Sequence, residues 1–286
     1  ITSRTKAIIP VHFAGLPVNM DELMALASEY GLHVLEDSAH AHGAKFRGKG
    51  AGSFGAFGSF SFQSSKNMNS GEGGILLTND EELYERANSL HSFGRLPGRP
   101  WYEHHIYSGN LRITELQSAI LRVQLSRLEK QNKIRRNNAA LLTEMLSEIP
   151  GITCVDPAGD DAKGRVCHIY VFRYSPEQFG GLNKEKFIEA LVAEGVPAAG
   201  GYPVPLYKQN LFMTKSAKAK GCPFSCPMYD GPEVDYAQMH LPGAEKACNE
   251  AVWLTQNLLL GEEQDMRDIV EAVQKIQANA TQLVKG

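Results

Sequence analysis

Apolar and polar positions in the first part of the chain follow a strand, helix, strand order. Short apolar runs at residues 7–12 and 32–36 predict buried strands, and helical spacing between them predicts a helix over 20–30. Asn19 supplies an N-cap for this helix, and Gly31 supplies the glycine that commonly ends one. This order predicts a parallel sheet with right-handed crossovers, in which ligands bind beyond the carboxyl ends of the strands.

Further helices and strands follow along the chain. Asp80 caps a predicted helix, residues 92–108 form a Gly/Pro-rich loop, and 114–149 read as one long helix with charged faces. The remaining predicted elements are strands at 168–174 and from 196 onward, and helices at 183–194, 243–251 and 262–283. A helix as long as 114–149 often bridges domains, so we expect a large domain over residues 1–135 and a smaller α+β domain over 136–286.

The composition is that of an ordinary globular protein. The 286 residues are 43% hydrophobic and 21% charged, with room for two packed domains or one large one. A net charge of -3 gives no support to nucleic-acid binding, and no apolar run reaches membrane-spanning length. We expect reduced thiols in a cytoplasmic protein, because the five cysteines are irregularly spaced. Cys222 and Cys226 have no second Cys/His pair at zinc-finger spacing, so no metal site is expected.

The segment around Lys66 carries the strongest chemical signal. An apolar strand at residues 57–62 precedes the lysine, and a glycine-rich turn at 71–74 leads from it into a second strand. This setting suits a Schiff-base lysine, which needs access for a cofactor and burial that lowers its pKa. Asp37 directly follows the predicted strand 32–36, at its carboxyl end, and offers a carboxylate for a pyridinium nitrogen. Each residue alone fits an ordinary surface role, but together they favour pyridoxal phosphate (PLP) chemistry.

Two other patterns invite different readings. Residues 50–55 match the dinucleotide motif G-x-G-x-x-G, but they lead into a strand and open no helix, as that motif requires. His33, Asp37, His40 and His42 resemble a metal-binding cluster, a reading that the lysine segment makes less favourable.

Three segments resemble a known family. Residues 36–44, 60–74 and 109–117 are similar to the DegT/StrS-type sugar aminotransferases, which are fold-type I PLP enzymes. The similarity extends from Arg4 to the C-terminal helix and is greatest to the inosose aminotransferases and the aminohydroxybenzoate synthases. It implies an α/β fold of the PLP-transferase type, with part of a mixed or parallel large-domain sheet, flanking helices and a C-terminal α+β domain.

The resemblance implies a role for each of five residues. Lys66 binds the cofactor covalently, and Asp37 pairs with the pyridine nitrogen. His40 stands where many members have Gln and lies near the phenolic oxygen of the ring, while Ser61 donates to the cofactor phosphate. Asn110 reaches the cofactor phosphate of the neighbouring subunit, which implies a homodimer with shared active sites.

The resemblance also exposes a gap near Ile1. In this family, the loop that supplies most phosphate-binding amides and the aromatic that stacks on the cofactor ring both precede the first strand of this chain. We therefore expect an N-terminally truncated sequence, which keeps Lys66 and Asp37 but binds PLP less tightly by itself.

The implied reaction is ping-pong transfer of an amino group from glutamate or glutamine to a keto-sugar or keto-cyclitol. Two alternatives remain: a dehydrating or aromatising PLP enzyme of the aminohydroxybenzoate type, and a non-catalytic interaction or sensory module. The candidates for substrate contacts are Arg95, His104 and Tyr202. A solvated loop explains Arg95 as well as substrate binding does and explains His104 better, and domain packing explains Tyr202 as well.

Overall fold

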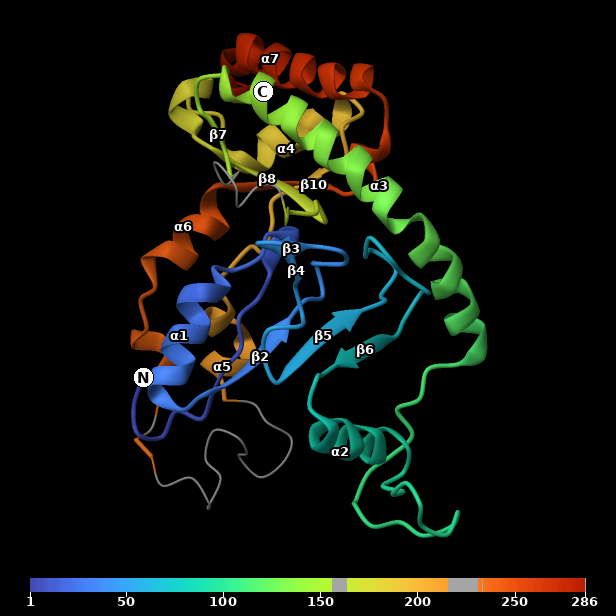
Figure 1. Cartoon of the computed structure of the whole chain (residues 1–286). Helices are drawn as coiled ribbons and strands as arrows, with labels where there is room; N and C mark the ends of the chain where they lie inside the picture. The colour runs from blue at the N-terminus through green and yellow to red at the C-terminus, as the bar shows by residue number, and fades with distance from the viewer. Residues whose placement is uncertain (156–163, 216–230, 233, 286) are drawn as a thin grey trace. The chain divides into compact units, whose positions relative to one another are not determined.

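A computed structural model describes residues 1–155, 164–215, 231–232 and 234–285 (Figure 1). Cys222 and Cys226 therefore lie outside the described residues. The chain divides into two compact units. Unit 1 contains Ile1–Thr143, Asp156–Tyr170 and Thr255–Met266, and unit 2 contains Glu144–Val155, Val171–Leu254 and Arg267–Gly286. The domain boundary expected at residues 135/136 stays a prediction. No helix within the described residues combines the length and the apolar character needed to cross a bilayer.

Unit 1 is built on a four-stranded sheet, in the order β1 (Ala7–Ile8), β2 (His33–Asp37), β5 (Phe57–Ser61) and β6 (Gly74–Leu77). The first three strands are parallel, as the sequence predicted, and β6 runs antiparallel to β5. The sheet is therefore mixed, and Figure 1 shows β2, β5 and β6 side by side. A small hairpin, β3 (Lys45–Phe46) and β4 (Lys49–Gly50), was not predicted from sequence.

The helices of unit 1 begin where the capping residues predict. In α1 (Met20–Tyr30) the Asn19 side chain accepts a hydrogen bond from the Glu22 amide, and α2 (Glu81–His91) is capped by Asp80 in the same way. The long helix α3 (Glu115–Ser147) begins with a reciprocal capping box. Thr114 Oγ1 accepts from the Gln117 amide, and Gln117 Oε1 accepts from the Thr114 amide.

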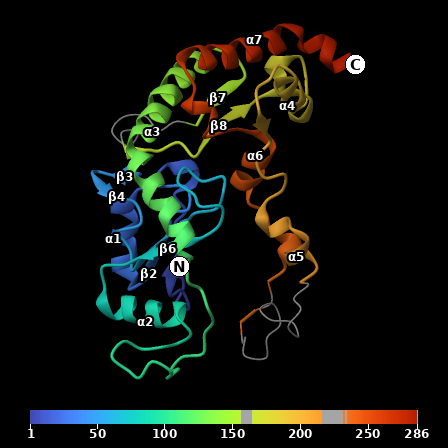
Figure 2. The same ribbon diagram turned by 90° about the vertical axis from the view of Figure 1, so that its right-hand side faces the viewer.

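Two apolar clusters attach these helices to the sheet region. Met20 and Ala27 of α1 pack with Val34 of β2. Leu121 and Leu128 of α3 pack against the segment that follows β5, through Phe62 and Met68. The turned view in Figure 2 shows α1 and α3 as separate helices beside the strands. Apolar contacts on both sides of Lys66 in the sequence, at Phe62 and Met68, thus attach its loop to α3.

Unit 2 contains a second sheet, in the order β7 (Ile152–Cys154), β8 (Ile169–Tyr174), β10 (Ala251–Thr255) and β9 (Ala198–Ala199). The first two residues of β8 belong to unit 1. The helices are α4 (Lys184–Ala193), α5 (Asn210–Met213), α6 (Pro242–Glu250) and α7 (Glu263–Lys285), which starts in unit 1. The predicted end of a helix at Ala251 was wrong by one residue, because Ala251 begins β10. Val252 and Leu254 alternate into the core of that strand, both with 0% exposure.

Glu36 fastens the strand β2 to the segment that leads into β5. Its side chain is buried, and its carboxylate accepts hydrogen bonds from the amides of Gly52, Phe54 and Gly55 at 2.6–2.8 Å. His12 Nε2 lies 3.0 Å from the same carboxylate. The backbone amides of the segment that matches the dinucleotide pattern therefore donate to a carboxylate of the protein itself. The segment leads into β5, as the sequence predicted.

We predict that Glu36→Gln lowers the free energy of unfolding by about 3 kcal/mol at neutral pH, since a neutral amide cannot accept all of these bonds. Burial raises the pKa of Glu36, but the hydrogen bonds from His12, Gly55, Gly52 and Phe54 outweigh it, so the folded pKa lies below 4.5. The stabilisation is therefore full above about pH 4.5 and is lost as the pH falls through the lowered pKa. Denaturant unfolding at several pH values measures both effects.

Glu29→Gln, at an exposed position on α1, serves as the matched control and should leave the unfolding free energy almost unchanged. An equal effect of the two substitutions would contradict the role given to Glu36.

Candidate active site

Lys66 lies in a tight loop between β5 and β6. The loop is closed by hydrogen bonds from the Phe62 amide to the Gly73 carbonyl and from the Ser70 amide to the Phe62 carbonyl. Within it, the Lys66 amide donates to the Gln63 carbonyl, and the Lys66 carbonyl accepts from Asn69 Nδ2. The side chain is half-buried. The amine therefore stands on a fixed backbone and remains accessible.

Asp37 ends β2, at the carboxyl edge of the parallel strands. Its neighbour on β5 is Ser59, and its Oδ1 accepts a hydrogen bond from the Ala39 amide at 3.1 Å. Burial lowers the pKa of Lys66, and the negative charge of Asp37 opposes that shift. The carboxylate and the amine therefore interact electrostatically.

His40 belongs to the same cluster. The Ala14 amide donates to its Nδ1 at 3.2 Å, and its ring packs against Phe13 and against His168, with a centroid separation of 4.2 Å for the second pair. Burial, together with the positive charge of Lys66, lowers the pKa of His40 to about 4, although Asp37 opposes the shift. The imidazole is thus neutral near pH 7. Since Nδ1 accepts a bond, the proton is on Nε2.

His168 and Asn67 belong to this cluster and were missed as site residues by sequence reasoning. His168 Nδ1 lies 3.1 Å from Asn67 Oδ1, and Asn67 Nδ2 donates to the Cys167 carbonyl at 3.1 Å. Burial lowers the pKa of His168 to about 3. No local pattern marks His168, which is 101 residues away from Asn67 and directly precedes β8. Asn67 directly follows Lys66, and this adjacency is the signal that could have suggested it.

Ser61 is the last residue of β5, directly before the loop that carries Lys66. It is half-buried, and its Oγ accepts a hydrogen bond from the Gln63 amide at 3.3 Å. Its position at the carboxyl edge of β5 is compatible with the predicted contact to a phosphate.

The other predicted residues lie in separate segments. Asn110 is exposed, and its Oδ1 accepts from the backbone amide and Nε of Arg112. Arg95 stacks on Phe93 and Trp101, and His104 Nδ1 is 2.8 Å from the Phe93 carbonyl. These contacts all join residues within the segment 93–112. Tyr202 belongs to unit 2, where its ring meets Trp253.

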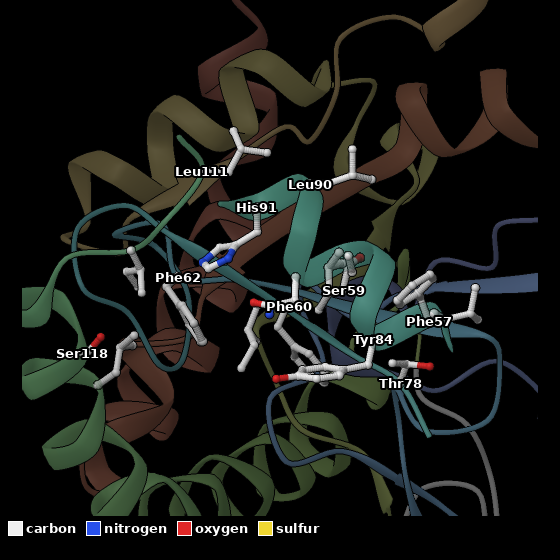
Figure 3. Close-up of a pocket in the computed structure, with 18 of the residues that line it drawn as sticks. Phe57, Ser59, Phe60, Phe62, Thr78, Tyr84, Leu90, His91, Leu111 and Ser118 are labelled. Atoms are coloured by element: carbon white, nitrogen blue, oxygen red, sulfur yellow. The ribbon is translucent and has the colours of Figure 1, made fainter. Parts of the chain in front are cut away.

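A large apolar cavity is distinct from this cluster. It has a volume of about 1080 Å³ and is lined mainly by β5, β6, α2 and the start of α3 (Figure 3). Its wall includes Phe57, Phe60 and Tyr84, but not Lys66 or Asp37. The titratable groups, and not this cavity, therefore define the candidate active site.

The described residues contain no group of three or more His, Cys, Asp or Glu side chains arranged to hold a metal ion. His33 begins β2 and Asp37 ends it, so the strand separates two members of the suspected cluster. The arrangement gives no support to the metal reading.

The sequence profile of the DegT/DnrJ/EryC1/StrS aminotransferase family matches residues 1–274. The chain belongs to this family. It is 41% identical, over 99% of its length and 68% of the relative's, to a Streptoalloteichus tenebrarius protein provisionally named L-glutamine:3-amino-2,3-dideoxy-scyllo-inosose aminotransferase. It is also 35% identical, over 92% of its length and 63% of the relative's, to a Geobacillus stearothermophilus protein named pleiotropic regulatory protein.

Among solved structures of the family's fold, 3-amino-5-hydroxybenzoic acid (AHBA) synthase matches with a TM-score of 0.82 and 32% identity. The match covers 98% of this chain and 69% of that one. The predicted fold class, the α/β fold of fold-type I PLP aminotransferases, is therefore confirmed. The chain spans about two thirds of the length of these relatives.

We predict that Asp37→Asn lowers the pKa of the Lys66 amine further, because the carboxylate that favours the charged amine is lost. The pH dependence of Lys66 modification by an amine-specific reagent, followed by peptide mass spectrometry, measures this pKa. Asp21→Asn, at an exposed position paired with Arg47, is the control. An unchanged Lys66 pKa in Asp37→Asn would show that the two groups do not interact.

Proposed function

We propose that the protein is a PLP-dependent aminotransferase that moves an amino group from glutamine or glutamate to a keto-cyclitol or keto-sugar. The observation that carries this proposal is the electrostatic pairing of the half-buried Lys66 amine with Asp37, beside the neutral imidazole of His40. The names of the relatives support the donor and the acceptor class, since one is named for L-glutamine and an inosose.

The residues present fit the cofactor in kind. Covalent attachment of PLP needs an accessible lysine whose pKa is lowered, and Lys66 is half-buried with a lowered pKa. A pyridinium ring needs an anionic partner, which Asp37 supplies at the strand end. A phenolic oxygen needs a donor, and the Nε2–H of His40 is one. Ser61 adds a hydroxyl at the same edge of the sheet.

When bound, PLP supplies an electron sink for the carbon that loses its proton. Asp37 would hold the proton on the pyridine nitrogen, because its charge favours the cationic ring. Lys66 Nζ, once free, would take the proton from the donor's α-carbon and deliver a proton in the same half-reaction. Burial supports this role, since it shifts the amine toward its neutral form. Donor and acceptor would use the site in turn, in ping-pong order.

Several finer assignments belong to the same proposal. Ser61 would bind the cofactor phosphate, and Asn110 would bind the phosphate in the partner subunit of a homodimer with shared sites. Asn110 is exposed and its side chain contacts Arg112, which supports a role in contacting a partner subunit. Arg95, His104 and Tyr202 are the candidates for substrate contacts. We expect the protein to work in the cytoplasm, where amino donors and keto-sugars are available.

The likeness to AHBA synthase favours one second candidate, a PLP enzyme that dehydrates or aromatises its substrate. The likeness to a protein named as a pleiotropic regulator is the feature that favours a regulatory module. Lys66 and Asp37 argue against a binding-only module, since such a module needs no electron sink.

We predict that the complete protein with PLP shows a visible absorbance band that survives dialysis and is absent in Lys66→Ala, because the band requires the covalent bond to Nζ. Turnover should fall by about a thousandfold or more, the scale of a lost acid–base group. The control is Lys133→Ala, at an exposed position on α3. Persistence of the band in Lys66→Ala would refute the assignment of the lysine.

A donor and acceptor panel separates the enzyme readings. With glutamine or glutamate alone, we expect the visible band of the bound cofactor to disappear, and a keto-cyclitol or keto-sugar should restore it with formation of an amine. Product mass spectrometry identifies the amine. A product that has lost water instead would favour the dehydrating alternative, and no spectral response to any donor would contradict transamination.

A further inference from the structure

Ala14 holds an unusual backbone conformation beside the candidate active site. It lies in the short 3₁₀ turn Phe13–Gly15, is buried, and has φ 57° and ψ 7°, in the left-handed region that residues with a Cβ atom rarely adopt. Such outliers persist where surrounding contacts determine the conformation. The contacts of Ala14 therefore indicate what this conformation serves.

Both backbone groups of Ala14 have partners in the cluster. Its amide donates to His40 Nδ1 at 3.2 Å, and its carbonyl accepts from the His168 amide at 3.0 Å. The next carbonyl, of Gly15, accepts from the Val166 amide at 3.1 Å. A Cβ at Gly15 would collide with the Val166 carbonyl, so glycine is needed there. Residues 13–15 thus join His40 to the segment 166–168.

His168 continues this connection to the lysine loop. Its ring packs against that of His40 in a tilted arrangement, with a centroid separation of 4.2 Å and an interplanar angle of 45°. Its Nδ1 lies 3.1 Å from Asn67 Oδ1. Because Asn67 Nδ2 donates to the Cys167 carbonyl, Asn67 Oδ1 is the acceptor and His168 Nδ1 carries a proton. The ring of His168 therefore has one fixed orientation between His40 and the residue that follows Lys66.

We propose that His168 is a positioning residue that, with the Ala14 amide, holds the His40 side chain as an Nε2–H donor beside Lys66. The ring of His168 keeps His40 against Ala14, and the Ala14 amide occupies Nδ1, so Nε2 is left as the donor. The identity of the acceptor at Nε2, the phenolic oxygen of PLP, rests on the proposed function. The assignment of the His40 tautomer does not rest on the proposed function, because the contacts that fix it, with Ala14 and His168, are within the chain.

The charges around His40 agree with a neutral ring. Lys66 disfavours a proton on His40, and Asp37 alone favours it. His42 and His168 also face this cluster, and burial lowers the pKa of each, to about 4 and about 3. His40 should therefore stay neutral down to about pH 5.5, where an unperturbed histidine is mostly charged.

The test is ¹⁵N NMR of the unliganded protein with labelled histidines, in which the His40 signals are identified by their loss in His40→Gln. We expect the neutral Nε2–H pattern for His40 between about pH 8 and pH 5.5. In His168→Ala, water and ring motion should raise the proton affinity of His40 at least about tenfold and mix its tautomers. In His168→Phe, which keeps the ring contact but not the bond to Asn67, His40 should behave as in the wild type.

A purely structural role of His168 would disturb His40 equally in both variants, and that result would overturn the proposal. An Nδ1–H tautomer of His40 in the wild type would also overturn it, even if a variant failed to fold. His33→Ala, at the exposed start of β2, is the control and should leave the His40 signals unchanged.

A second measurement separates this proposal from the proposed function. In protein loaded with PLP, the pH dependence of the visible band should shift in His168→Ala but not in His168→Phe. If PLP does not bind, the function fails while the NMR result still decides the tautomer. If PLP binds and the band responds equally in both variants, the positioning role fails and the function stands.

Discussion

The place of β2 between two parallel neighbours decides which way two consecutive carboxylates point. Hydrogen bonding to β1 and β5 fixes the register, so that Glu36 lies opposite Gly58 and Asp37 opposite Ser59. Successive side chains of a strand alternate between faces. Glu36 therefore turns inward to the amides of Gly52, Phe54 and Gly55, and Asp37 is left for the edge where Lys66 lies. A slip of one residue would exchange the two roles.

Burial sets the charge state of the site. Desolvation keeps the imidazoles of His40, His42 and His168 neutral. It also lowers the pKa of Lys66, and the charge of Asp37 opposes that shift. Neutral rings can occupy a confined space next to a lysine without repelling it, and they retain directed hydrogen bonds. The same burial that lowers the pKa of Lys66 thus also makes its neighbours compatible with it.

The fold and the cofactor residues alone do not select a reaction. One relative is named for an inosose aminotransferase, a solved structure is an AHBA synthase, and another relative is named as a regulator. In the proposed function, Lys66 and Asp37 supply groups that PLP chemistry of any kind requires. We propose that residues outside the cluster select the substrate. The candidates Arg95, His104 and Tyr202 all lie in loops, where function commonly varies on a constant scaffold.

The sequence by itself determined much of the local structure and indicated the chemistry that we propose for Lys66. Capping pairs such as Thr114 and Gln117 satisfy each other within a few residues, so the start of α3 could be predicted from spacing. The lysine and its glycine turn are likewise contiguous. Strand β10 was missed, because the run of residues 251–255 is short and directly follows a helix. The cavity and the hairpin β3–β4 also gave no reliable local signal.

Only the tertiary structure decided the surroundings of the lysine. His168 and Asn67 are 101 residues apart, and Ala14 and His40 are 26 apart, so no local spacing links them. The left-handed backbone at Ala14 is imposed by contacts with His40 and His168 and contradicts the local preference of alanine. Sequence patterns report what neighbouring residues favour, whereas the protonation and orientation of a buried ring depend on which distant groups exclude water from it.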